Sequence, residues 1–185
     1  MKRQRVLPAN LLTGLCAMFL IIAAGGRDGA AAQDHVARPI DPARFYKGTW
    51  LEVARRPMWI TEGCGYGTTH YSPTGRPNEI HVRDACRKGG RAGPETVLEG
   101  PAEILDPGVN RRLNVRYNPL LSAEYHIVDQ ADDYSWFIET SPTLDNLFIY
   151  TRAKPSRKKL ESLVSRARSL GFDTSNLEYP WGVSP

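Results

Sequence analysis

The chain has 185 residues and a formal net charge of +4, but most of this charge lies at the N-terminus. Within residues 1–32, Lys2, Arg3, Arg5 and Arg27 outweigh Asp28 by +3, which leaves +1 for the rest of the chain. This balance excludes a strongly basic, nucleic-acid-binding protein, and no nucleic-acid partner is predicted. The ordinary apolar content of 41% allows a packed core in one domain or two small ones.

Residues 1–32 are predicted to be a secretory signal peptide. A basic start precedes the apolar run 11–24, which is too short and too close to the N-terminus for a comfortable membrane span. Ala30 and Ala32 are the small residues that a signal peptidase reads, so we expect cleavage after Ala32, with an uncleaved anchor as the alternative. The mature protein is therefore expected in the periplasm or outside the cell.

The three cysteines have different predicted roles. Cys16 follows Leu15 and precedes further apolar residues, unlike a lipid-attachment cysteine, so no lipid anchor is expected. Cys64 and Cys86 remain after processing, and export to an oxidising compartment favours a disulfide between them. No metal site and no cofactor are predicted, because the histidines lack the spacing of metal ligands. They are His35, His70, His81 and His126.

Short segments with alternating side chains follow one another from the stretch 46–57 onward, separated by Gly, Pro and Asn turn signals. Ile80 and Val82 in one segment, and Leu113 and Val115 in another, alternate with polar residues. This period of two is typical of antiparallel strands that are buried on one face. Eight strands are predicted, within 46–57, 65–72, 78–86, 95–100, 111–119, 123–130, 134–140 and 146–152.

Three arginines, Arg111, Arg112 and Arg116, resemble a basic patch. They stand at the start and on the polar side of an alternating strand. A solvated outer face is therefore predicted for all three, rather than a binding surface.

One helix is predicted after the strands, capped by Ser156 and ended by Gly171. A basic amphipathic helix of this kind can make peripheral contact with an anionic membrane. The preferred interpretation is that its apolar stripe packs on the strands while its basic residues face water. The stripe comprises Leu160, Leu163, Val164, Ala167 and Leu170, and the basic residues are Lys158, Lys159, Arg166 and Arg168.

An open sheet of eight antiparallel strands would expose two edges. Closure into an up-and-down barrel removes both edges and leaves room for about one small ligand. The predicted fold is therefore all-β: an eight-stranded up-and-down antiparallel barrel with one C-terminal helix packed on the outside. An avidin-like barrel, which would have no such helix, and a two-sheet sandwich are the alternatives.

Four blocks of the sequence resemble the lipocalin family, and most closely its bacterial branch related to apolipoprotein D. "DPARFYKGTWLEVAR" resembles the first lipocalin signature, with Gly48 and Trp50 as its Gly-x-Trp. "YHIVDQADDYSWFIETSP" and "LFIYTRAKP" resemble the second and third, with Arg152 as the signature arginine, and "SLGFDTSNLEYPW" resembles the segment after the helix. The resemblance covers roughly residues 40–181, which makes 33–44 a leading segment and 45–181 the lipocalin domain.

The resemblance implies a structural role for the signature residues. Trp50 is expected to lie across the closed end of the barrel, beneath the guanidinium of Arg152, in a cation–π contact. Gly48 would let the chain turn tightly into the first strand. None of the three is expected to contact a ligand.

The strand alternation and the resemblance together predict an apolar, aromatic-lined cavity for a small hydrophobic ligand, such as a fatty acid or a lysophospholipid. Glu52 shares the face of Trp50 as a candidate buried carboxylate, and Trp136 is a candidate neighbour of the ligand. Plain core filling is the alternative for each inward residue. The predicted ligand-binding residues are Tyr71, Ile80, Val82, Leu113, Val115, Tyr117, Tyr125, Ile127, Phe148 and Tyr150.

No Gly-x-Ser-x-Gly, phosphate loop or His-Glu-x-x-His occurs, so no catalytic residue is predicted. The leading hypothesis is a non-enzymatic carrier of a lipophilic molecule. A lipocalin-type enzyme that uses an inward acid such as Glu52, and an envelope interaction protein with a filled barrel, are the alternatives. No oligomeric state is predicted.

The register of the second hairpin supports the predicted disulfide. Counting outward from Gly75, the expected centre of the turn, places His70 opposite Ile80 and Cys64 opposite Cys86. Opposite residues of antiparallel strands lie close enough for a disulfide, whereas a bulge would offset the pair.

Overall fold

The structure is a computed structural model that describes residues 38–185. The predicted signal peptide, its cleavage site and Cys16 lie outside the described residues.

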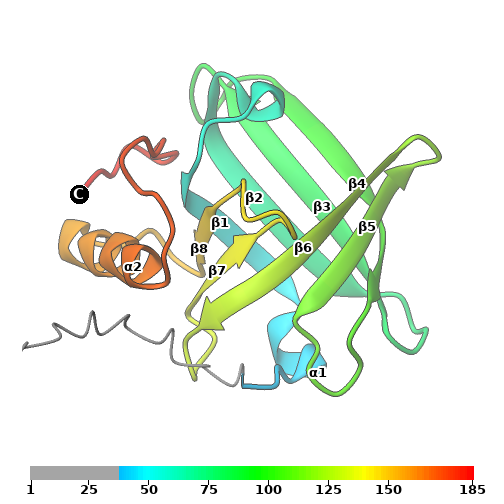
Figure 1. Cartoon of the computed structure of the whole chain (residues 1–185). Helices are drawn as coiled ribbons and strands as arrows, with labels where there is room; N and C mark the ends of the chain where they lie inside the picture. The colour runs from blue at the N-terminus through cyan, green and yellow to red at the C-terminus, as the bar shows by residue number, and fades with distance from the viewer. Residues whose placement is uncertain (1–37) are drawn as a thin grey trace, which may run out of the picture. The chain divides into compact units, whose positions relative to one another are not determined.

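Eight antiparallel strands form a closed meander in which each strand pairs with the next and β8 pairs back with β1 (Figure 1). This confirms the predicted up-and-down barrel, whose closure leaves no free sheet edge. The strands are β1 (Gly48–Arg55), β2 (Cys64–Pro73), β3 (Glu79–Lys88), β4 (Glu95–Ile104), β5 (Arg112–Asn118), β6 (Leu121–Gln130), β7 (Trp136–Thr140) and β8 (Phe148–Thr151).

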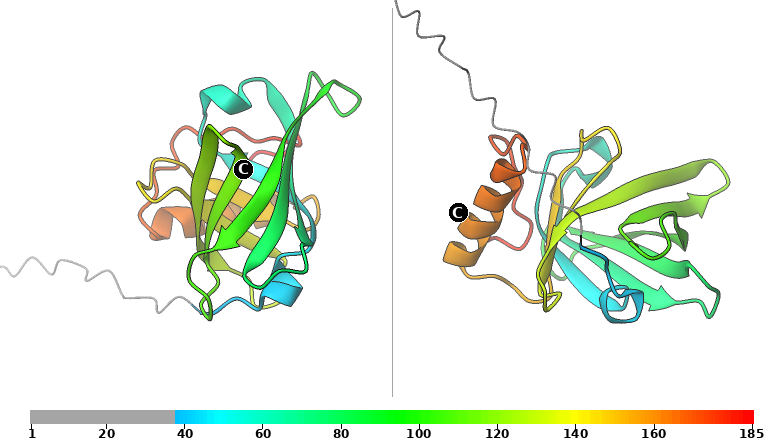
Figure 2. Two further views of the ribbon diagram at one scale, coloured as in Figure 1. Left: turned by 90° about the vertical axis from the view of Figure 1, so that its right-hand side faces the viewer. Right: turned by 60° about the horizontal axis from the view of Figure 1, so that its bottom comes forward.

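The helix α2 (Arg157–Ser169) packs against the outside of the barrel (Figure 2). Ser156 caps it by accepting a hydrogen bond from the Lys159 amide at 3.2 Å, and Gly171 follows it with a φ of +93°. The buried stripe forms one cluster with the outward residues of β1, β7 and β8, as the preferred interpretation predicts. This cluster includes Leu160, Leu163, Val164, Ala167, Val53, Ala54, Ile138 and Ile149.

Trp136 belongs to this outer cluster, so the expectation that it lies near the ligand is wrong. Phe137, the next residue of β7, packs inside the barrel, and neighbouring side chains of a strand point to opposite faces. The Lys159 ammonium lies 5.5 Å from the Trp136 ring centroid on the helix side. No helix among residues 38–185 is long and apolar enough to cross a membrane.

One end of the barrel is closed by the chain that leads into β1. The short helix α1 (Pro42–Phe45) covers this end, and Ile40, Phe45 and Tyr46 are buried there. The side chain of Asn110, from the loop between β4 and β5, donates to the Ile40 carbonyl at 2.9 Å. The opposite end carries the loop between β1 and β2, which contains the 3₁₀ turn η1 (Trp59–Thr61).

The predicted register of the β2–β3 hairpin is wrong, although the hairpin itself is present. Ile80 pairs with Pro73 rather than with His70, which pairs with Arg83. Gly75 and Asn78 both adopt positive φ, so the turn extends over residues 74–78 and its centre lies beyond Gly75.

Arg111 also departs from its prediction, because it is buried rather than solvated. It lies just before β5, and its guanidinium donates to the carbonyls of Ile127 and Arg38 at 2.7 and 2.9 Å. It therefore ties the β4–β5 loop to β6 and to the leading segment. Arg112 and Arg116 are exposed, as predicted.

Candidate ligand-binding cavity

An aromatic plug fills the closed half of the barrel. The Trp50 ring lies 4.7 Å from the Phe137 ring and 5.1 Å from the Phe45 ring, centroid to centroid. Phe137 in turn stacks on Tyr150 at 4.6 Å. These contacts leave no room for a ligand at this end, because edge-to-face and stacked rings at such distances are in direct contact.

Arg152 seals the plug from outside. Its guanidinium carbon lies 3.5 Å from the Trp50 ring centroid, so the cation–π contact that the resemblance implied is present. The same guanidinium donates to the carbonyls of Phe45 and Lys47 at 3.0 and 2.7 Å. Gly48 has a φ of +68°, a left-handed conformation that favours glycine and directs the chain from α1 into β1.

The open half of the barrel contains a cavity of about 340 Å³, within the range of small-molecule sites. Of the ten predicted ligand-binding residues, Ile80 and Ile127 are buried in the barrel core but do not line this cavity. The other eight form part of its wall: Tyr71, Val82, Leu113, Val115, Tyr117, Tyr125, Phe148 and Tyr150.

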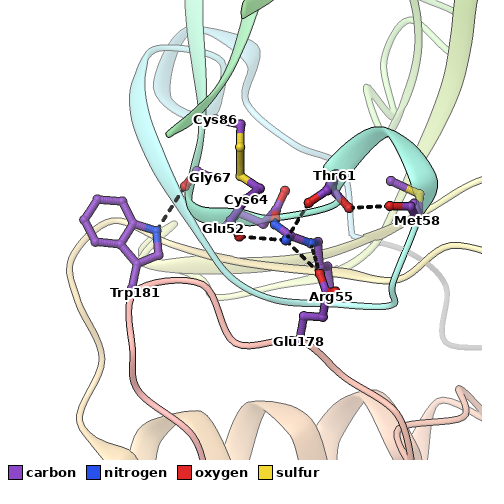
Figure 3. Close-up of a disulfide and its surroundings, with 9 residues drawn as sticks. All are labelled: Glu52, Arg55, Met58, Thr61, Cys64, Gly67, Cys86, Glu178 and Trp181. Carbon is purple, nitrogen blue, oxygen red and sulfur yellow. Dashed lines mark hydrogen bonds and ion pairs between the residues drawn. A yellow bond between two sulfur atoms is a disulfide. The ribbon is translucent and has the colours of Figure 1, made fainter. Parts of the chain in front are cut away.

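Glu52 lines the cavity and forms a buried ion pair with Arg55, at the end of the same strand. Arg55 also donates to Glu178 at 2.8 Å and to the Cys64 carbonyl at 2.8 Å. Burial lowers the pKa of Arg55, but the two carboxylates outweigh it and hold that pKa above its ordinary value. Arg55 therefore remains charged beside Glu52 (Figure 3), and it opposes the rise that burial causes in the pKa of that carboxyl.

The C-terminal segment bridges β1 and β2 where their pairing stops. The backbone of Glu178 pairs with Arg55 of β1, and the indole nitrogen of Trp181 donates to the Gly67 carbonyl of β2 at 3.0 Å (Figure 3). Gly67 also lets β2 approach Glu52 closely, since a Cβ there would lie 2.9 Å from Oε1 of Glu52. We call residues 178–181 the C-terminal strap.

The predicted disulfide between Cys64 and Cys86 is confirmed, and both cysteines line the cavity. Their Cα atoms lie 5.5 Å apart although they are not directly opposite, because Cys64 pairs with Lys88 and Cys86 with Gly67. A bulge between Cys64 and Tyr66 shifts the register, and this diagonal placement brings the two sulfur atoms together.

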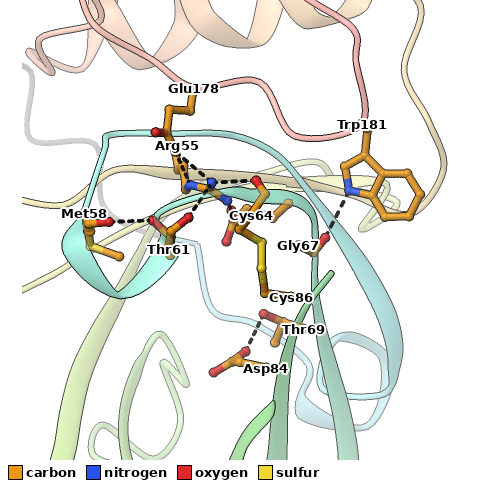
Figure 4. Close-up of polar contacts among 11 residues, drawn as sticks. Arg55, Met58, Thr61, Cys64, Gly67, Thr69, Asp84, Cys86, Glu178 and Trp181 are labelled. Carbon is orange, nitrogen blue, oxygen red and sulfur yellow. Dashed lines mark hydrogen bonds and ion pairs between the residues drawn. A yellow bond between two sulfur atoms is a disulfide. The ribbon is translucent and has the colours of Figure 1, made fainter. Parts of the chain in front are cut away.

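Asp84 of β3 is a second carboxyl on the cavity wall, and it accepts two hydrogen bonds. The Thr69 hydroxyl donates to Oδ1 at 2.6 Å (Figure 4), and the Tyr117 hydroxyl donates to Oδ2 at 2.5 Å. Burial raises the pKa of Asp84 above its usual range, and these two donors oppose that rise. The Tyr117 hydroxyl also lies 3.1 Å from the Tyr125 hydroxyl, and this contact extends the polar network from β5 to β6.

Glu139 of β7 is the third carboxyl of the cavity, and it is only 4% exposed. Its Oε2 atom is buried without a hydrogen-bond partner among the described residues. Burial raises the pKa of Glu139 well above its usual range, and the nearby charges of Asp84 and Glu52 raise it further. A buried carboxyl in this position is costly to ionise unless a cation or a donor reaches it.

Asp84 and Glu139 were missed as site residues, although the strand alternation contains a signal for both. Asp84 stands two residues after the inward Val82, and Glu139 stands two residues after Phe137. Side chains two apart in a strand share a face, so an acid that continues an inward apolar series is a candidate cavity residue. Among residues 38–185, His, Cys, Asp and Glu side chains form no cluster of three that could hold a metal ion.

The barrel has one plugged end, one open cavity and an external C-terminal helix. This architecture is typical of small closed barrels that can hold one small ligand. A family model described as a lipocalin-like domain matches residues 40–181, and the chain belongs to this family. The chain is 29% identical over 140 residues to a protein of Acanthamoeba polyphaga mimivirus that is named as a lipocalin, R877. The match covers 71% of this chain and 79% of that protein.

Solved structures share this fold at low sequence identity. Insecticyanin from the tobacco hornworm Manduca sexta has a TM-score of 0.58 and 14% identity, with 80% of this chain and 88% of that chain covered. Japanin from Rhipicephalus appendiculatus, solved with cholesterol bound, has a TM-score of 0.53 and 10% identity, with 76% and 95% covered. At these identities the likeness is one of fold.

Proposed function

We propose that this protein binds one small lipophilic molecule in the open half of its barrel. The observation that carries the proposal is the cavity of about 340 Å³, whose wall combines aliphatic and aromatic side chains with a few polar groups. A barrel filled by its own side chains would leave no such space, so the filled-barrel alternative is disfavoured. The eight predicted residues on the cavity wall are the proposed ligand contacts.

Exposed apolar side chains in the loops at the open end support the same function. Trp59 in η1 is 85% exposed, and Leu120 in the turn between β5 and β6 is 98% exposed. Large apolar side chains are costly to leave in water, and at the rim of a cavity they offer a lipophile its first contacts.

A binding role rather than catalysis is proposed because the acid named as a possible catalytic residue is already engaged. Glu52 is paired with the buried Arg55, which occupies the carboxylate that a substrate would have to engage. Japanin, which shares the fold, was solved with cholesterol bound, and this supports a lipophile as the ligand here.

We further propose that the chain belongs to the bacterial lipocalin branch related to apolipoprotein D.

The proposed location is the periplasm or the outside of the cell. The Cys64–Cys86 disulfide supports it, because disulfides persist in oxidising compartments. Peripheral membrane contact through α2 would use the basic residues of that helix, since its apolar stripe is buried against the barrel.

A cavity-filling variant tests the proposed function. Ala123 of β6 lines the cavity, whereas its neighbour Ser122 is exposed on the outer face. We expect a hydrophobic dye to bind the unaltered protein saturably, with a change in fluorescence. Ala123→Phe should weaken this binding at least tenfold, whereas the control Ser122→Phe should leave it unchanged. Absence of saturable binding by the folded protein, or equal binding by Ala123→Phe, would contradict a ligand in the cavity.

A further inference from the structure

The carboxyl groups of the cavity outnumber its buried cations. Glu52, Asp84 and Glu139 all line it, whereas Arg55 is the buried cation beside it among the described residues, and it contacts Glu52 rather than the other two. Lys88, which also lines the cavity, is exposed. The interior of the open half therefore favours positive charge.

The three carboxyls differ in the ion-pair and hydrogen-bond partners that the protein provides for them. Arg55 pairs with Glu52, and the hydroxyls of Thr69 and Tyr117 donate to Asp84. Glu139 is different, because its Oε2 atom has no donor within the described part of the chain. A buried polar atom without a partner is rare in folded proteins, and each such atom calls for an explanation. Here the atom belongs to Glu139, which is one of the residues of the cavity wall.

Aromatic residues line the cavity together with this carboxyl. Phe148 of β8 pairs directly with Glu139 of β7. The pKa values of Tyr71 and Tyr150 are raised by burial and also by the charges of Glu139 and other cavity acids, so these hydroxyls share its electrostatic environment. A cavity wall that combines a carboxyl with aromatic side chains favours an organic cation, because ring faces and carboxylates both attract positive charge.

We propose that the ligand is a lipophilic amine, and that its ammonium group binds Glu139 while its apolar body occupies the remaining cavity. This inference rests on the proposed ligand-binding function and narrows it to one class of ligand. A fatty acid, in contrast, would bury its own carboxylate in a cavity whose one neighbouring buried cation among the described residues, Arg55, is already paired with Glu52. The amine enters as the ammonium ion that already exists in water. A proton held by Glu139 in the empty cavity passes to solvent as the ion pair forms.

Three probes with the same hydrocarbon chain test the proposal: decylamine, decanol and decanoate. Their affinities for the unaltered protein are measured by isothermal titration calorimetry at pH 7. We expect decylamine to bind at least tenfold more tightly than decanol, and decanoate to bind most weakly.

The variant Glu139→Gln keeps the shape of the side chain and removes its charge. It should lower the affinity for decylamine at least tenfold and leave that for decanol unchanged. The matched control is Glu103→Gln, which makes the same charge change at an exposed position of β4 and should alter neither affinity. If Glu139→Gln fails to fold, Glu139→Met provides the same comparison with an apolar side chain.

The possible results separate this inference from the function on which it rests. If none of the three probes binds, the proposed function itself is contradicted. If decanol or decanoate binds as tightly as decylamine, the cavity binds lipophiles and the amine proposal is overturned. If decylamine is preferred but Glu139→Gln binds it unchanged, the assignment of Glu139 is overturned.

Discussion

The two halves of the barrel differ in how fully their polar groups are hydrogen-bonded. In the closed half, Arg152 is held by backbone carbonyls and by the Trp50 ring. In the open half, Glu139 is buried without a partner for its Oε2 atom. Each half also contains one unpartnered buried atom among the described residues, but the one in the closed half is the neutral Nε1 of Trp50. The Trp50 nitrogen is enclosed by aromatic rings and Arg152, whereas Glu139 lines the cavity, so a ligand could satisfy the unpartnered group of the open half but not that of the closed half.

Removing the plug should have the largest effect on stability. Trp50 is fully buried, and Trp50→Ala is expected to lower the free energy of unfolding by about 3–5 kcal/mol. Arg152→Ala should cost less, about 1–2 kcal/mol, through the lost cation–π contact. Denaturant unfolding monitored by circular dichroism measures both. An unchanged free energy of unfolding combined with abolished ligand binding in either variant would show that these residues belong to the binding site instead.

Removing the disulfide should have the next largest effect, on the open half. The bond joins residues 22 apart in sequence, and the double variant Cys64→Ser, Cys86→Ser is expected to lose about 3 kcal/mol, because its unfolded chain is less constrained. Intact mass with alkylation, before and after reduction, first establishes that the bond is present. Two cysteines that are freely alkylated in the exported, unreduced protein would contradict the pairing.

The smallest predicted effect is a pH dependence from the cavity acids. Because the pKa of Glu139 is raised in the folded protein, the folded state holds more protons than the unfolded state above the usual carboxyl pKa. Stability should therefore fall as the pH rises from the usual carboxyl pKa toward the raised pKa of Glu139. Glu139→Gln should remove this slope, so its stability relative to the unaltered protein should increase from pH 5 to pH 8.

Chemical unfolding at a series of pH values provides the measurement, with Glu103→Gln as the exposed control. Asp84 also has a raised pKa, so the variant is expected to retain a smaller slope. A stability difference between Glu139→Gln and the unaltered protein that stays constant over this range would contradict a raised pKa at Glu139.

The barrel and its helix were predictable because their signals are local. Alternation along each strand and the stripe of α2 follow directly from which face is buried, and these patterns can be read within a few residues. The inward positions Val82, Val115 and Tyr150 were correctly placed in the interior for the same reason.

The details of the site depend on contacts between segments that are distant in sequence, and these were not predictable. The register of the β2–β3 hairpin depends on which turn residues adopt positive φ. Because both Gly75 and Asn78 do so, the centre of the turn lies beyond Gly75. Arg111 is buried because carbonyls of Ile127 and Arg38 meet it in the folded chain. Nothing in the sequence near Arg55 indicates its role, because its partner Glu178 is 123 residues away.

The C-terminal strap has a consequence for the order in which the barrel assembles. Hairpins such as β2–β3 join neighbouring segments, whereas the pairing of β1 with β8 and of Arg55 with Glu178 joins opposite ends of the domain. Contacts between distant segments have the greatest entropic cost of loop closure, so they form late and slow the folding of the chain. We therefore expect the cavity to be the last part of the molecule to form, and the gap between β1 and β2 to be among the first to open during unfolding.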